Sequence, residues 1–288
     1  MNKKYLQYII FIGFCFSIFI FNGCAKNTEK EDEMLFSAIR QNNLQSAESA
    51  IAAGANINKK DPDGWTPLNL AVDKNKKDMA ELLLLKGANI NCTDQYGWTP
   101  LHLACWASNE DMVKLLLDKG ANVNAKSETG DTPLHIICDK YDKAILIMLL
   151  DKGANVNAKN SYGHTPLFIA VKNGQRFTSD LLLSRGADVN AKDHGGDSVL
   201  HDAVESGYIG TVQLIVSKGA DINAKNNMGM TALAFAVFKN KPDIVEYLIS
   251  KGADVNMRDK LNQTPLDIAL NKKFKDIEAI LIKHGGIE

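Results

Sequence analysis

Residues 94–126, which read DQYGWTPLHLACWASNEDMVKLLLDKGANVNAK, decide the fold. Parts of this stretch recur every 33 residues, without insertion or deletion, over most of the 288-residue chain. Glycine, leucine and asparagine each recur at one equivalent position of successive periods, and such a set of equivalent positions is called a column below. The three columns are Gly54, Gly87, Gly120, Gly153, Gly186, Gly219, Gly252 and Gly285; Leu35, Leu68, Leu101, Leu134, Leu167, Leu200, Leu233 and Leu266; Asn58, Asn91, Asn124, Asn157, Asn190, Asn223 and Asn256. A fixed period of this length indicates a stack of similar supersecondary modules.

Within each period the residue types predict a turn followed by two short helices. Gly97 lies where a hairpin tip requires a positive φ, and Asn262 takes that place in the last period. Thr99 followed by Pro100 places an N-cap hydroxyl before a proline at the first helical position. A second apolar segment follows over residues 112–117, and glycine ends it as a left-handed helix stop.

The sequence TPLHLA over residues 99–104, with GANVN over residues 153–157, resembles the ankyrin repeat. The resemblance covers residues 31–288 and implies an all-α ankyrin-repeat solenoid, in which helix-turn-helix units are joined by β-hairpin-like loops. Eight repeats are expected, with caps at both ends: residues 31–60, 61–93, 94–126, 127–159, 160–192, 193–225, 226–258 and 259–288.

The first 23 residues have the order of a secretory signal peptide. Lys3 and Lys4 precede an uncharged apolar run over residues 5–21. Gly23-Cys24 then resembles a bacterial lipoprotein processing site, which implies cleavage before Cys24 and its lipidation. Residues 24–30 are expected to form a tether, and the chain to be exported and lipid-anchored in the cell envelope.

Two other readings of the N-terminus stay open. The apolar run approaches the length that spans a bilayer, so an uncleaved signal-anchor would also hold the chain at the membrane. A secreted effector that binds a host protein is the other alternative. The lipoprotein and the signal-anchor readings both place residues 25–288 outside the cytoplasm.

Composition excludes several classes of function. A formal net charge of -1 gives no electrostatic attraction toward nucleic acid. The five cysteines include no C-x-x-C pair, and the histidines are dispersed, so neither a metal site nor any other cofactor is expected. Cys105 and Cys138 share a column with valines and are predicted to be core residues, whereas Cys92 has no assigned role.

Residues 193–202 imitate a hydrolase site, because Ser198, His201 and Asp202 follow a glycine pair. The repeat register explains Ser198 and His201, which occupy the threonine and histidine columns of TPLH. An esterase-like hydrolase therefore remains only an alternative, and we expect no catalytic residue and no enzyme. Asp202 lies in a column that is otherwise apolar, and its carboxylate is expected to face a neighbouring hydroxyl or water.

The resemblance implies that a protein partner is bound by the hairpin tips and the exposed, concave side of the first helices. The variable columns there predict these contact residues: Trp65, Tyr96, Trp98, Trp106, Tyr162, His164, Met228, Met230 and Phe238. Exposed aromatic side chains dominate many interfaces, although a tryptophan after the tip glycine can also stack on the next hairpin. The predicted function is a monomeric, non-catalytic protein–protein interaction module, anchored on the extracytoplasmic side of a membrane.

Overall fold

A computed structural model describes residues 28–288 of the chain. The described residues fall into two units, an N-terminal block that ends at Asn122 and a C-terminal block over residues 123–288. The predicted signal peptide and Cys24 lie outside the described residues. Within residues 28–288, none of the helices combines the length and the apolar character that crossing a membrane requires.

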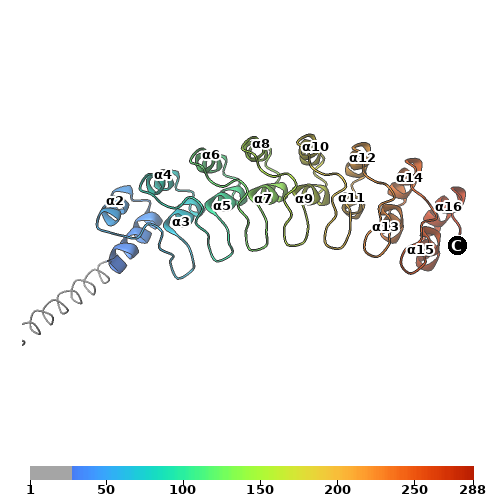
Figure 1. The fold of residues 1–288 in the computed structure, drawn as a ribbon, viewed down its shortest axis with the longest axis horizontal. Coiled ribbons are helices and arrows are strands. Elements are labelled where there is room, and N and C mark those ends of the chain that lie inside the picture. The colour runs from blue at the N-terminus through green and yellow to red at the C-terminus, as the bar shows by residue number, and fades with distance from the viewer. Residues whose placement is uncertain (1–27) are drawn as a thin grey trace, which may run out of the picture. The chain divides into compact units, whose positions relative to one another are not determined.

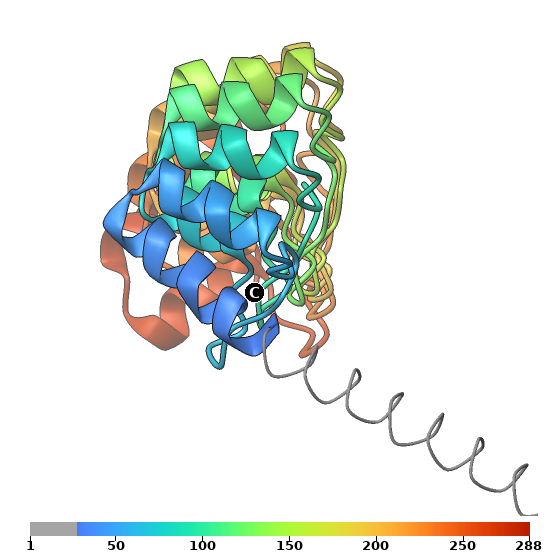
Figure 2. The ribbon, with the colours of Figure 1, turned by 90° about the vertical axis from the view of Figure 1, so that its left-hand side faces the viewer.

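The N-terminal block consists of short helices joined by loops. A helix over residues 28–41 is followed by α2 (Leu44–Ala52), α3 (Pro67–Asp73), α4 (Lys77–Leu85), α5 (Pro100–Trp106) and α6 (Glu110–Asp118). Figure 2, in which this block faces the viewer, shows its helices on one side and its longer loops on the other. The first helix includes residues 28–30, which were expected in the tether; Glu29, Lys30 and Glu31 all favour helix.

The C-terminal block continues the pattern. Its helices are α7 (Pro133–Lys140), α8 (Lys143–Asp151), α9 (Pro166–Lys172), α10 (Arg176–Ser184), α11 (Val199–Ser206), α12 (Ile209–Ser217), α13 (Ala232–Phe238), α14 (Pro242–Ser250), α15 (Pro265–Lys272) and α16 (Lys275–Lys283). In this block the first helices of the repeats form one row and the second helices another (Figure 1). The predicted all-α ankyrin solenoid is confirmed. Among residues 28–288, strand-like pairing is limited to isolated bridges in loops, such as Lys192 with Ser198.

The predicted turn and cap residues have the expected geometry. Thr66 and Thr264 accept hydrogen bonds from backbone N–H groups in the first turns of α3 and α15. Asn262 adopts a φ of 62°, in the left-handed region that its place at the tip requires. At Gly229 the φ is 78°, and a Cβ would also lie 2.7 Å from the backbone nitrogen of Lys260. A side chain is therefore excluded there both by conformation and by the neighbouring hairpin.

The leucine column forms the centre of the core in both blocks, with every member at most 4% exposed. Cys105 and Cys138 are fully buried thiols, as predicted for core residues. Burial raises the pKa of the Cys138 thiol, because a thiolate would lose its hydration there. These cysteines therefore contribute packing, not nucleophilic chemistry.

The asparagine column connects each repeat to the next. Each Oδ1 accepts a hydrogen bond from the backbone N–H group 31 residues later, at 2.7–3.0 Å, from Asn58 to Asn256. Asn157 also donates from Nδ2 to the Gly186 carbonyl oxygen at 3.0 Å. One side chain thus pairs two polar backbone groups of the following loop, which explains why asparagine recurs at this position.

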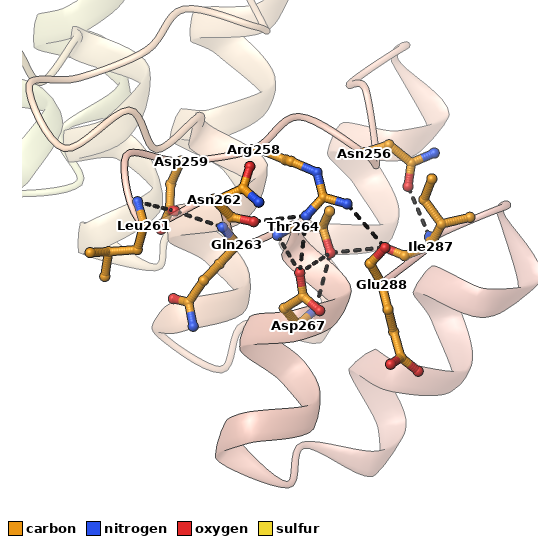
Figure 3. Close-up of polar contacts among 10 residues, drawn as sticks. All are labelled: Asn256, Arg258, Asp259, Leu261, Asn262, Gln263, Thr264, Asp267, Ile287 and Glu288. Atoms are coloured by element: carbon orange, nitrogen blue, oxygen red, sulfur yellow. Dashed lines mark hydrogen bonds and ion pairs between the residues drawn. The ribbon is translucent and has the colours of Figure 1, made fainter.

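A lysine column adds a second connection that the sequence analysis did not identify. Lys126, Lys159, Lys192 and Lys225 each donate from Nζ to the carbonyl oxygen 33 residues later, at 2.7–3.0 Å. Arg258 takes this position at the end of the seventh repeat and donates to the carbonyl oxygens of Asn262 at 2.7 Å and Glu288 at 3.0 Å (Figure 3). The basic side chains hold consecutive loops in register.

We expect Asn157→Ala to lower the free energy of unfolding by about 1–3 kcal/mol, since two hydrogen bonds between repeats are lost. Asn155→Ala is the matched control, because the Asn155 side chain accepts from the N–H of Asn157, within its own loop, and not from the next repeat. Urea unfolding of both variants measures the difference. A control that costs as much as Asn157→Ala would contradict this role for the asparagine column.

Candidate protein-interaction surface

The N-terminal block carries an aromatic group made of Tyr96, Trp98, His102 and Trp106. The rings of Trp98 and Trp106 meet edge to face with centroids 5.6 Å apart, and Trp98 lies 6.1 Å from His102. Trp106, at the end of α5, is 51% exposed, and Tyr96 is exposed at the hairpin tip. Trp98 is half-buried, so it both packs in the repeat and reaches the surface.

The hairpin holds these residues through the side chain of Asp94. One carboxylate oxygen accepts hydrogen bonds from the backbone N–H groups of Tyr96 and Trp98, each at 2.8 Å. Asp61 does the same for Trp65, which is half-buried, at 2.9 Å. Acidic, amide or hydroxyl side chains recur at this position in every described hairpin and fix the loop that presents the tip.

In the C-terminal block, Tyr162 is exposed on its hairpin and His164 is half-buried beside it. The His164 ring stacks on Phe168 of α9, with centroids 5.3 Å apart, and its Nε2 lies 3.6 Å from an Asp193 oxygen. Burial lowers the pKa of His164, and the Asp193 carboxylate opposes that change. His164 is therefore in part a packing residue that supports Tyr162.

Met230 was predicted to be an exposed contact residue, but its side chain is buried. Met230 is 6% exposed, whereas Met228 at the same hairpin tip is 63% exposed. The flexible thioether of Met230 fills space within the structure, and its carbonyl oxygen lies 3.0 Å from His201 Nε2. Phe238, at the end of α13, is exposed, and Lys272 Nζ lies 4.1 Å from its ring centroid.

Three buried histidines cap first helices. In His102, His135 and His201, Nδ1 accepts the N-cap backbone N–H at 3.1–3.2 Å and lies 2.8–2.9 Å from the N-cap hydroxyl oxygen. Nε2 of His135 lies 3.1 Å from the His164 carbonyl oxygen, in the next repeat. With Nδ1 accepting, the proton belongs on Nε2, and the neutral ring bridges two repeats. Burial lowers the pKa of both His135 and His201.

The same geometry explains the serine and histidine of residues 193–202. Ser198 Oγ lies 2.8 Å from His201 Nδ1, but Ser198 is 3% exposed and His201 Nε2 is occupied by a backbone carbonyl. Threonine and histidine make the same pair in α5 and α7. Ser198 and His201 thus form a helix cap, and this segment lacks the geometry of a hydrolytic site.

Asp202 does not face a neighbouring hydroxyl, which was one of the two partners expected for its carboxylate. No hydroxyl group among residues 28–288 donates a hydrogen bond to its carboxylate, and the residue is 8% exposed. The equivalent positions in neighbouring repeats, Ile169 and Phe235, are apolar and offer no donor. Burial raises the pKa of Asp202 to about 7.

Cys92 acquires a role that its sequence position did not reveal. Its sulfur lies 3.0 Å from Thr66 Oγ1 and donates to Asn69 Oδ1 at 3.2 Å. The thiol thus joins the cap of α3 to the following loop, and burial raises its pKa. Among the described residues, no group of three or more histidine, cysteine or acidic side chains could hold a metal ion.

A second aromatic group, which the sequence analysis missed, lies where first and second helices join in the C-terminal block. Tyr141 and Phe177 are exposed, and Lys143 Nζ lies 5.6 Å and 4.5 Å from their ring centroids. Together with Arg176 the two rings line an open hollow. Asparagine and glycine recur at the position of Tyr141, and aspartate recurs at the position of Phe177, so the period predicts an aromatic ring at neither.

Comparison with known proteins identifies the repeats. Residues 34–127, 125–193 and 200–288 match the family described as ankyrin repeats in three copies. The chain belongs to the ankyrin-repeat family. One similar solved structure is the crystal structure of the ankyrin repeat domain of Bcl-3, described as a unique member of the IkappaB protein family. It is 33% identical and covers 76% of this chain and 99% of that chain, with a TM-score of 0.68.

No curated protein matches the chain. Ankyrin repeats are a protein–protein interaction module, and folds of this kind are generally non-enzymatic. The family thus agrees with the absence of hydrolase geometry at residues 193–202. In the ankyrin scaffold the repeated columns are used for stacking, which leaves variable positions at the tips and on the first helices, where Tyr96, Trp106 and Met228 are exposed.

The capping histidines predict a pH dependence of stability. The folded protein keeps His135 and His201 neutral, whereas the unfolded chain binds protons below about pH 6.5. The free energy of unfolding should therefore fall as the pH drops through 6.5 toward the lowered folded-state pKa values. We expect His135→Asn with His201→Asn to flatten this fall between pH 6.5 and 5, since Asn69 already occupies the equivalent position in α3.

Urea unfolding measured across this pH range provides the test. The raised pKa of Asp202 makes the free energy of unfolding rise as the pH falls, opposite to the effect of the histidines. Asp202 is present in both proteins, so it does not affect the comparison. His194→Asn removes an exposed imidazole and serves as the control. An unchanged slope in the double variant would rule out the histidine caps as the cause.

Proposed function

We propose that this chain is a non-catalytic protein-binding module that grips its partner with the hairpin tips and the exposed side of the first helices. The observation that carries this proposal is the half-exposed Trp106, packed edge to face with Trp98 beside the exposed tip residue Tyr96. Large aromatic surface left outside a core is a frequent centre of binding energy. The exposed Tyr162, Met228 and Phe238 provide similar surface in the C-terminal block.

We further propose that the module is displayed outside the cytoplasm of a bacterium, held at the membrane by lipid on Cys24. The basic start, the apolar run over residues 5–21 and Gly23-Cys24 support this arrangement. The partner would then be a protein of the cell envelope, or one that reaches it from outside. Affinity capture from envelope fractions, with residues 25–288 as bait, is the experiment that identifies it.

We expect Trp106→Ala to weaken binding to the captured partner by about 2–4 kcal/mol, as is typical of an aromatic hot spot. The free energy of unfolding should change by less than about 1 kcal/mol, because half of the ring is already exposed. Phe177→Ala, which removes an exposed aromatic ring from the second-helix row, is the control. Calorimetry with the purified partner and urea unfolding of each variant separate binding from folding.

Trp98→Ala should affect both quantities, because Trp98 is half-buried against His102 and Trp106. If Trp106→Ala lowers the urea midpoint strongly and leaves the affinity intact, the tryptophan pair is a packing feature and the proposed binding surface is wrong.

Palmitate labelling tests the membrane anchor. We expect label on the wild-type chain and none on Cys24→Ser, since the cysteine thiol is the acceptor in lipoprotein processing. The mature wild-type chain should also have lost residues 1–23. Equal labelling of the two chains would exclude lipidation of Cys24, and an uncleaved chain would favour the signal-anchor.

A further inference from the structure

Asp202 lies in the row of first-helix positions that otherwise holds large apolar side chains. Ile136, Ile169, Phe235 and Ile268 occupy the equivalent positions in the other repeats of the C-terminal block. Ile169 and Phe235 are half-buried, so this row reaches the surface next to Asp202. Helix α11, which carries Asp202, packs against α9 on one side and α13 on the other.

The packing of the repeat does not account for a carboxylate at this place. An apolar side chain serves in each neighbouring repeat, and no group among residues 28–288 donates a hydrogen bond to the Asp202 carboxylate. Burial raises the pKa of this carboxyl group, so the folded chain without a ligand stabilises the protonated form. A buried ionised carboxylate normally has a partner, and here the protein supplies none in contact.

The charges that act on Asp202 favour a positively charged ligand. They are Lys172 at the end of α9, Glu205 on α11 itself, and Asp193 and Asp197 on the preceding hairpin. Lys239, which directly follows α13, lies close by: its Nζ is 2.7 Å from Glu205 Oε1 and 5.1 Å from the Phe235 ring centroid. Within its bounds α12 carries no charged side chain, and the adjacent His201 is held neutral as a cap. Lys172 is the strongest single charge acting on Asp202, but three acidic groups stand against two basic groups there, and Asp202 itself adds a fourth acid.

We propose that Asp202 receives a lysine or arginine side chain from a protein partner, with Ile169 and Phe235 contacting the aliphatic part of that side chain. This rests on the proposed protein-binding function and names the chemistry of one contact within it. The cation forms a charge-assisted hydrogen bond with the carboxylate, and its apolar stem covers the two half-buried neighbours. Asp202 then acts as a specificity residue that the ankyrin scaffold itself does not need.

Binding of such a cation should depend on pH. The carboxyl group must release its proton to pair with the cation, so affinity should rise between pH 6 and 8 and then level off. Asp202→Asn removes the titrating group and should make this part of the profile flat. Lys172, Glu205, Asp193 and Asp197 remain in both proteins and act as a common background.

Selection from a random-peptide phage library on residues 25–288, followed by affinity measurement with the enriched synthetic peptides, tests the inference. We expect peptides that contain lysine or arginine, whose affinity falls at least tenfold on Asp202→Asn and on replacement of their basic residue. Asp243→Asn, which removes an acidic charge from the second-helix row at α14, should change affinity less than twofold. Asp202→Leu restores the apolar row and should match or exceed the wild-type urea midpoint while losing the same binding.

The outcomes separate this inference from the proposed function. Peptides that bind Asp202→Asn as well as the wild type would overturn the role of Asp202 and leave the protein-binding module intact. Failure to enrich any peptide on the wild type would count against the module and against Asp202 together. A fall in the urea midpoint of Asp202→Leu would show that the carboxylate serves the scaffold and would also overturn the inference.

Discussion

The other features depend on the hydrogen bonds that each asparagine Oδ1 accepts from the backbone N–H group 31 residues later. Helices of seven to nine residues are too short to be stable alone, so each repeat needs its neighbour. The hydrogen bonds of the asparagine column fix the spacing of consecutive loops. The lysine column fixes it a second time, because each Nζ donates to the carbonyl oxygen 33 residues later. One inserted residue within a loop would break both, which is consistent with a period free of insertions.

This spacing determines which side chains remain available for binding. The threonine, leucine, asparagine and lysine columns are used in capping, packing and bridging, so their chemistry is set by the scaffold. The tips and the outer side of the first helices carry no such demand, and there Tyr96, Trp106, Tyr162 and Met228 are exposed. Apolar side chains that stay exposed gain no hydrophobic free energy from folding. A partner that buries them gains this free energy on binding.

The sequence was sufficient for features that are local or periodic. Thr66, Gly229 and Asn262 have the predicted roles because caps and positive-φ turns depend on a few adjacent residues. The burial of Met230 was missed because a variable column says nothing about how a long side chain packs against its surroundings. The sequence showed that these histidines recur at one position of the repeat but did not predict that they cap helices. Their second hydrogen bond joins Nε2 to a carbonyl oxygen 29 residues later, which the local sequence does not reveal.

The adjacent residues His201 and Asp202 show how a scaffold position can be told from a ligand position. Both are buried titratable groups on α11, and burial opposes the charged form of each. His201 has both ring nitrogens in hydrogen bonds and its neutral form suffices, so its burial is compensated within the repeats. Asp202 lies among apolar neighbours without a donor, so its burial costs stability that an isoleucine would not. A cation brought from outside would compensate that cost, and the carboxylate is therefore the group that distinguishes this surface from the apolar row around it.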